Sequence, residues 1–237
     1  MSELVNITGM SNQEFLAKYA KAGHIGLSGG ITLIDRAIRR AERHLDDEKR
    51  WGRWSHVFVF QGQRADGHHW IIESDLQFVH KHISLGVQEN RVTKYHDDKL
   101  YTWLAVIDLG LTEPQAKELV REALDLVANR TRYSIRELFG TLLALRHPGL
   151  RGKDNVLSRN NSLYCSAFVQ HLFRKVGHDL APGVDSKNTT PEDIARTPLA
   201  RVTYLLDRPH LHEKTTTLAA KLRERVQARL KKKASAK

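Results

Sequence analysis

The chain has a single cysteine, Cys165, among its 237 residues. An internal disulfide is therefore excluded, and a hydrophobic core has to hold the fold together. Hydrophobic residues make up 41% of the sequence, which is enough for one core of α/β or α+β type. This cysteine usage does not require an oxidising compartment.

Cys165 also lies at the predicted start of a helix. The apolar residues after it recur at helical spacing: Ala167, Phe168, Val169, Leu172, Phe173 and Val176. Ser162 is placed to cap the start of this helix and Gly177 to end it. Unpaired N–H groups and the helix dipole favour a thiolate in the first turn, which suits a nucleophile. The alternative is a small buried core residue, which is common for free cysteines.

Two β-rich runs around a glycine-bounded turn predict a hairpin. The runs cover 54–61 and 68–74, with the turn at 62–67. If Gln61 pairs with His68, then His56 lies opposite Glu73, on the same face of the sheet. The carboxylate would orient the imidazole and favour its protonated form, as a cysteine nucleophile requires. A slip of one residue would place the two side chains on opposite faces.

Five short motifs follow one another in a distinctive order. They are Ser55-His56-Val57, Ile72-Glu73-Ser74, Gly86-Val87, Tyr164-Cys165-Ser166 and Thr190-Pro191-Glu192-Asp193-Ile194-Ala195. Over roughly residues 23 to 200 the chain resembles the circularly permuted papain-like hydrolases of the NlpC type, in their YiiX-like branch. The order histidine, acid, cysteine is the order that the permutation implies. The usual Gly-Asp-Ile near the start is replaced by Gly23-His24-Ile25-Gly26.

The resemblance implies an α+β, papain-like fold with an antiparallel sheet packed on the helix that carries Cys165. It implies that Cys165 attacks an acyl carbon, that His56 takes and returns the proton, and that Glu73 holds the imidazole. Tyr164 and Ser166 are expected to line the substrate site. The implied function is a cysteine hydrolase acting on a small molecule, a peptide amide or a lipid ester, or else an acyltransferase. No cofactor and no metal are implied.

The positive charge is concentrated at the C-terminus. Residues 209–237 carry nine Lys and Arg against two Glu, which is +7 of the total +11. Apolar residues at every fourth position predict an amphipathic basic helix over 215–233. We therefore divide the chain into a catalytic domain, 1–208, and a basic helix and tail, 209–237. The tail suits an anionic membrane surface or an acidic partner, and a non-enzymatic binding module that uses it is the competing hypothesis. No nucleic-acid motif accompanies it, so specific nucleic-acid binding is not expected.

Further elements are predicted by local patterns. We expect a peripheral helix over 12–22 after the capping box Ser11–Glu14, a helix over 32–45, a strand over 104–109, and helices over 112–127 and 134–146. The glycine run 26–30 is interpreted as a turn. The polar segment 147–162, directly before the nucleophile, is expected to be a lid, a substrate rim or a plain surface connection.

Two further patterns bear on metals and on compartment. The histidines at 68, 69, 80, 82 and 96 lack a second cysteine or a His-Glu-x-x-His helix, so a zinc site is not expected. No charged start followed by an apolar run is present at the N-terminus, and no apolar stretch has the length of a membrane span. These features predict a cytoplasmic protein, or one exported without a cleaved leader.

Overall fold

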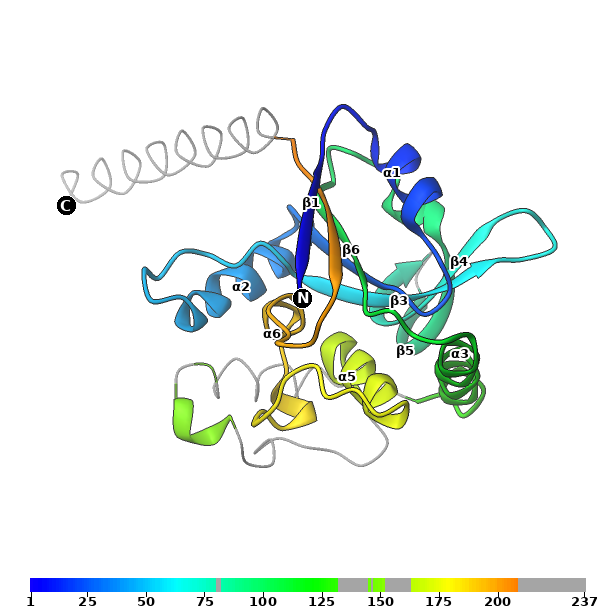
Figure 1. Cartoon of the computed structure of the whole chain (residues 1–237). Helices are drawn as coiled ribbons and strands as arrows, with labels where there is room; N and C mark the ends of the chain where they lie inside the picture. The colour runs from blue at the N-terminus through cyan, green and yellow to red at the C-terminus, as the bar shows by residue number, and fades with distance from the viewer. Residues whose placement is uncertain (80–81, 132–144, 146, 152–162, 209–237) are drawn as a thin grey trace.

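A seven-stranded mixed sheet forms the centre of the computed structural model, in the strand order β1-β7-β6-β2-β3-β4-β5 (Figure 1). The structure describes residues 1–79, 82–131, 145, 147–151 and 163–208. The strands are β1 (Glu3–Ile7), β2 (Ile25–Gly30), β3 (His56–Gln63), β4 (His69–Val79), β5 (His82–Arg91), β6 (Tyr101–Asp108) and β7 (Val202–Leu206). The helices are α1 (Asn12–Tyr19), α2 (Leu33–Ala41), α3 (Glu113–Ala128), α5 (Cys165–Lys175) and α6 (Pro191–Ala195). The protein is therefore of the α+β class.

The two ends of the described chain meet at one edge of this sheet. β1 pairs with β7 in parallel, with Glu3 opposite Val202, while the other described strand pairs are antiparallel. The prediction of an antiparallel sheet is thus wrong at this edge. The pairing joins segments about two hundred residues apart, and no local pattern in the sequence indicates it.

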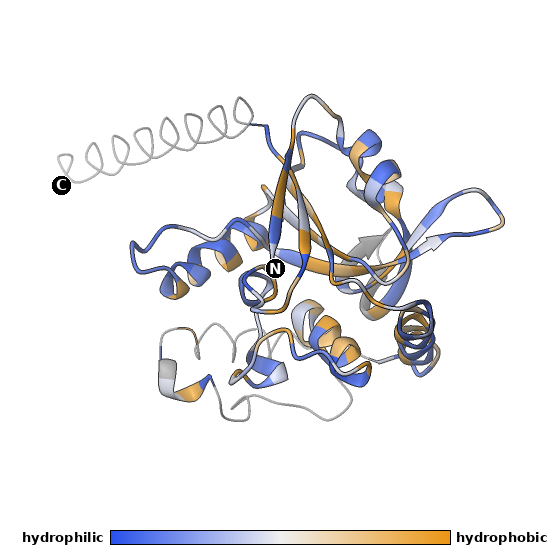
Figure 2. Cartoon of the chain, in the orientation of Figure 1, coloured by the Kyte–Doolittle hydropathy of each residue, from blue (hydrophilic) through white to orange (hydrophobic). Residues whose placement is uncertain are grey.

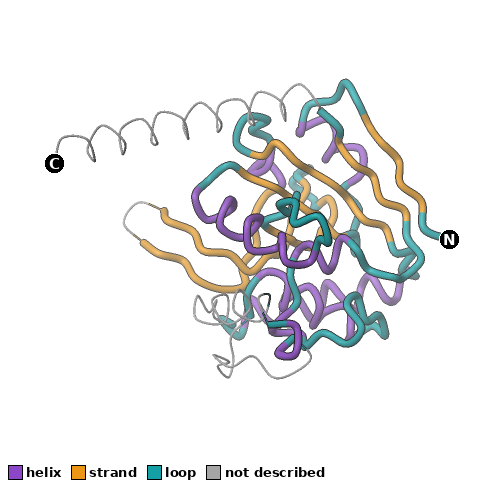
Figure 3. The backbone as a smooth tube through the Cα atoms, turned by 90° about the vertical axis from the view of Figure 1, so that its left-hand side faces the viewer, coloured by secondary structure: helices purple, strands orange, loops and turns teal. Residues whose placement is uncertain are grey.

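The sheet separates two hydrophobic cores. α5 and α3 pack on one face, together with Val57 and Val59 of β3. α1 and the 3-10 turn Val92–Tyr95 pack on the other face, together with Phe58 and Phe60. Side chains that alternate along β3 therefore enter different cores. Figure 2 shows orange, apolar residues along the central strands and on part of α5, and Figure 3 shows helices on both sides of the strands.

The N-terminal helix is not peripheral, in contrast to the prediction. The capping box of Ser11 and Glu14 is present and α1 starts at Asn12, as expected. Phe15 and Leu16 are completely buried in the second core, however, and the Asn12 side chain donates hydrogen bonds to main-chain carbonyls near Tyr95. The helix is thus an integral part of the sheet domain.

Most other local predictions are confirmed. Thr32 and Thr112 each form a capping box, at the starts of α2 and α3. The predicted strand at 104–109 is β6, which begins three residues earlier. The glycine run is not a turn but lies in β2, where a Cβ on Gly26 would clash with the ring of Phe58. Glycine is needed there because an aromatic ring lies directly against the backbone.

Some predictions fall outside the described residues. These are the helix at 134–146 except Leu145, the part of the loop at 152–162, and the basic helix and tail at 209–237. Of the loop, Pro148–Leu150 forms a 3-10 turn. Among the helices described, none combines the length and the apolar run needed to cross a membrane.

Candidate active site

Cys165 is the first residue of α5, as predicted, and its side chain is buried, with 4% of the residue exposed. The N-cap residue is Tyr164, which makes no side-chain cap bond, so the predicted cap by Ser162 is wrong. Gly177 ends the helix as expected, with a positive φ of 85° that glycine adopts without strain. The thiol therefore lies in the first turn, where helix N–H groups have no partner within the helix.

His56 is the first residue of β3 and is in contact with Glu73 of β4. The imidazole Nε2 lies 2.8 Å from the carboxylate Oε2. The predicted register was nevertheless wrong, because Val59 pairs with Ile72 and a bulge before Gly62 takes up one residue. Extending this register sets His56 opposite Asp75, so Glu73 is a diagonal neighbour. The error is two residues, which keeps both side chains on one face of the sheet.

Glu73 is a fully buried carboxylate with four hydrogen-bond donors around it. Besides His56, Oε2 accepts from the Tyr95 hydroxyl at 2.6 Å. Oε1 accepts from Asn90 Nδ2 at 2.7 Å and from Lys94 Nζ at 2.6 Å. Lys94 also contacts Asp75 Oδ2 at 2.5 Å. A buried charge is stable only when it is paired and hydrogen-bonded, and here both conditions are met.

This environment sets the charge of the group. Burial alone would raise the pKa of Glu73, but the Lys94 ammonium and the bond to His56 hold it well below its ordinary value. Burial and the neighbouring Glu73 charge raise the pKa of the Tyr95 hydroxyl, so this group remains a donor. Glu73 is therefore ionised and fixed in place beside the imidazole.

His56 connects this cluster with Cys165. Burial would lower the pKa of His56, yet the negative charge of Cys165 and a side-chain hydrogen bond with it, together with Glu73, raise that pKa well above its ordinary value. The His56 ring stacks near Phe58 and Tyr95 of the second core, while Cys165 belongs to the first. His56 and Cys165 thus lie on the two sides of the boundary between the cores, at the start of β3 and the start of α5.

A metal ion does not fit this cluster. Ligand atoms of His56, Glu73 and Asp75 lie within 4.8 Å of one another, which is close enough for a shared ion. The Lys94 ammonium, however, contacts both carboxylates at 2.5 and 2.6 Å. It supplies the positive charge that a metal would otherwise bring, so this arrangement suits an ion-pair network.

The cavity beside Cys165 is small, at about 10 Å³, roughly the space of one water molecule. Tyr164 and Ser166, the two residues predicted to line the substrate site, both line this cavity. Ser166 Oγ lies 3.8 Å from the sulfur, whereas the Tyr164 hydroxyl donates to the Thr189 carbonyl at 2.8 Å. Ser55 also lines the cavity and donates to an aspartate of α2, which fixes the backbone just before His56.

A second buried glutamate lines the same cavity. Glu42, at the end of α2, is 1% exposed, and its Oε1 accepts from the backbone N–H of Glu192 at 3.0 Å. Its Oε2 has no hydrogen-bond partner among the described residues. Burial and then the neighbouring Glu192 raise the pKa of Glu42 well above its ordinary value, and the charge of Cys165 adds to the shift. This environment favours the uncharged form of Glu42 beside the thiol.

Sequence reasoning found the three central residues but missed their surroundings. Asn90, Lys94 and Tyr95 come from the end of β5 and the following 3-10 turn, and Glu42 comes from the end of α2. None of the four belongs to a motif with chemical meaning on its own. The run Asn90 to Tyr95 could have been linked to Glu73 only if the β4–β5 pairing had been known.

Comparison with known proteins adds no further assignment. Neither the scan against protein-family models nor the search of curated proteins finds a match to this chain.

Proposed function

We propose that the protein is a cysteine-dependent hydrolase or acyltransferase of permuted papain-like fold, with Cys165, His56 and Glu73 as its catalytic group. The observation that carries the proposal is the position of His56, whose Nε2 lies 2.8 Å from the Glu73 carboxylate and whose pKa the negative charge of Cys165 helps to raise. A nucleophile, a base and an oriented acid in contact are the arrangement that acyl transfer requires. The motif order in the sequence supports the papain-like assignment.

The reaction follows from the charges in this group. The Cys165 thiolate attacks the acyl carbon and forms a C–S bond, while the His56 imidazolium gives its proton to the departing amine or alcohol. Neutral His56 then accepts a proton from water, or from an acceptor alcohol or amine, whose oxygen or nitrogen attacks the thioester. The C–S bond breaks and the thiolate is restored. Nε2 is engaged by Glu73, so this proton exchange uses Nδ1 of His56.

The developing oxyanion has a donor in the first turn of α5. The backbone N–H of Cys165 is at the helix N-terminus, where the helix dipole favours negative charge. A neutral Glu42 in the same cavity is consistent with this role, because a second charged carboxylate would oppose both the thiolate and the oxyanion. The small cavity implies that an acyl group displaces neighbouring side chains when it binds.

The rate of iodoacetamide labelling at Cys165 tests the proposal. In mildly acidic solution the wild type is expected to label at least about tenfold faster than His56→Ala, because removal of the imidazolium leaves the thiolate without its cation. His171→Ala is the matched control. His171 lies on α5, the helix that carries Cys165, and its Nε2 is 3.2 Å from Glu122 Oε1, so this variant removes a different histidine–glutamate contact. Equal labelling rates in wild type and His56→Ala would overturn the catalytic assignment.

A further inference from the structure

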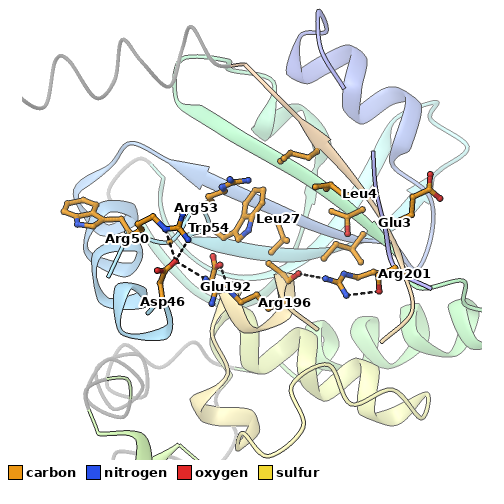
Figure 4. Close-up of a pocket in the computed structure, with 17 residues that line it drawn as sticks. Glu3, Leu4, Leu27, Asp46, Arg50, Arg53, Trp54, Glu192, Arg196 and Arg201 are labelled. Carbon is orange, nitrogen blue, oxygen red and sulfur yellow. Dashed lines mark hydrogen bonds and ion pairs between the residues drawn. The ribbon is translucent and has the colours of Figure 1, made fainter. Parts of the chain in front are cut away.

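A second and larger cavity lies away from Cys165. Its volume is about 430 Å³, within the range of roughly 300–1,000 Å³ typical of small-molecule sites. Segments from β1, β7, α6 and the loop before β3 surround it (Figure 4). The three proposed catalytic residues do not line this cavity. Any role for it therefore goes beyond the proposed function and does not depend on it.

The cavity has an apolar floor. Leu27 of β2 and Trp54 lie at its centre in Figure 4, and Ile107 and Leu205 contribute from β6 and β7. All four side chains belong to the hydrophobic core of the domain. Such a surface favours a ligand with an apolar body, because burying that body removes apolar area from water.

Carboxylates neutralise part of the rim. Arg50 contacts Asp46 at 3.3 Å, and Arg196 contacts Glu192 at 2.7 Å. Figure 4 shows these two pairs along the same side of the cavity. The guanidinium groups in this part of the rim therefore already have anionic partners.

Two further arginines of the rim, Arg53 and Arg201, differ from Arg50 and Arg196 in their partners. Among the described residues, no carboxylate forms an ion pair with Arg53 or Arg201. Arg201 donates to main-chain carbonyls, including that of Ala195 at 3.2 Å, and burial lowers its pKa. Arg53 is exposed and stacks over Trp103, 5.1 Å from the ring centroid.

Glu3 of β1 is the third carboxylate of the lining, beside Asp46 and Glu192, and no ion pair joins it to Arg53 or Arg201. Four arginines against three carboxylates leave the lining with a small excess of positive charge beside an apolar floor.

We propose that this cavity binds an amphipathic anion, with its apolar body on the Leu27 and Trp54 floor and its carboxylate or phosphate head group at Arg53. Arg201 adds a second positive charge at the opposite end of the cavity (Figure 4). A guanidinium pairs well with either head group, since both present two oxygens to its parallel N–H donors. Fatty carboxylates and alkyl phosphates are therefore the two candidate ligand classes, because both combine an apolar chain with an anionic head group.

Binding is measured by tryptophan fluorescence on the Cys165→Ala protein, so that turnover cannot contribute to the signal. Trp54 lines the cavity and Trp103 contacts Arg53, so both can report on occupancy. The probes are octanoate, octyl phosphate, octanol and octylamine, which share one chain and differ in head group. We expect saturable binding of one or both anions, at least about tenfold tighter than binding of octanol or octylamine. The anion that binds more tightly shows whether the cavity prefers a carboxylate or a phosphate head group.

Two variants locate the site. Arg53→Gln is expected to weaken anion binding about tenfold, while Arg91→Gln, which removes an arginine stacked on Trp70 elsewhere, leaves it unchanged. Ala195→Phe fills the cavity from α6 and is expected to abolish binding in a protein that still unfolds cooperatively. If Ala195→Phe does not fold, Arg53→Gln decides. Unaltered affinity in Arg53→Gln, equal affinity for octanol, or no saturable binding of either anion would overturn the proposal.

Discussion

Two glutamates near the proposed catalytic group are equally buried, and their pKa values are shifted in opposite directions. Glu73 is ionised, with four donors from His56, Asn90, Lys94 and Tyr95. Burial raises the pKa of Glu42 well above its ordinary value, and this group has a single N–H donor and an unpartnered Oε2 among the described residues. The supply of donors and cations, and not burial itself, therefore decides whether a carboxyl group in this protein is charged.

The difference between the two glutamates matters for the proposed function. An ionised Glu73 holds the His56 cation in place, and a neutral Glu42 avoids a second negative charge near the thiolate. Glu73 thus supports the proposed ion pair of Cys165 and His56, and a neutral Glu42 does not oppose it. Exchanging either carboxyl for an amide should therefore have very different consequences.

The largest expected difference is in turnover. Glu73→Gln removes the charge that stabilises the imidazolium, and we expect a loss on the order of 10²-fold or more, smaller than that of Cys165→Ala. Glu42→Gln replaces one neutral group with another and is expected to stay within a few-fold of wild type. Both are measured with an acyl substrate found by activity profiling. Similar losses in the two variants would contradict the assigned charge states.

The next largest difference is in the free energy of unfolding near pH 7. Glu73→Gln leaves the half-buried Lys94 without its buried carboxylate partner, and we expect a loss of about 3 kcal/mol. Glu42→Gln is expected to be neutral or stabilising, because the amide cannot ionise. Urea unfolding of both variants checks this. A loss above about 2 kcal/mol in Glu42→Gln would show that its carboxylate form is needed.

The pH dependence of stability should also differ in sign. Below its ordinary pKa of 4.5, Glu73 takes up a proton in the unfolded chain but not in the folded protein, so its contribution to stability is lost as pH falls. Above pH 4.5, Glu42 loses its proton in the unfolded chain but keeps it when folded, so stability declines as pH rises toward its folded pKa. Urea unfolding from pH 3 to 8 checks this. The free energy of unfolding of Glu73→Gln should lack the decline toward low pH, and that of Glu42→Gln should lack the decline toward high pH.

The smallest effect concerns one donor of Glu73. Tyr95→Phe removes the hydroxyl bond of 2.6 Å but keeps the ring stacked on Phe58, and we expect a loss of about 1–2 kcal/mol. Tyr101→Phe is the control, because its hydroxyl has no hydrogen bond in the described part of the chain and its ring also packs against Tyr95. Equal effects of the two variants would mean that the donors contribute little to the charge of Glu73.

Local chemistry made much of this structure predictable. The capping boxes at Ser11, Thr32 and Thr112 and the start of the helix at Cys165 involve contacts within a few residues, so the sequence indicates them directly. The contact of His56 with Glu73 was predicted from a wrong register. It survives because a two-residue error preserves the face of a strand.

The rest depends on contacts between distant segments. The bulge before Gly62 shifts the hairpin, and β1 pairs with β7 only once the whole sheet is assembled. Three donors of Glu73 come from β5 and the turn after it, and Glu42 accepts its hydrogen bond from the Glu192 backbone of α6, 150 residues away. Charge and protonation at the site depend on these contacts, so no pattern near Cys165 could have supplied them.

Whether Cys165, His56 and Glu73 form one charged unit is decided most directly by the titration of His56. The Cε1 proton of His56, assigned by its loss in His56→Ala, is followed by NMR across pH in wild type and in Cys165→Ala. We expect His56 to remain protonated well above its ordinary pKa in the wild type, and its pKa to fall in Cys165→Ala, where the thiolate is missing. An identical His56 titration in the two proteins would contradict the charged unit.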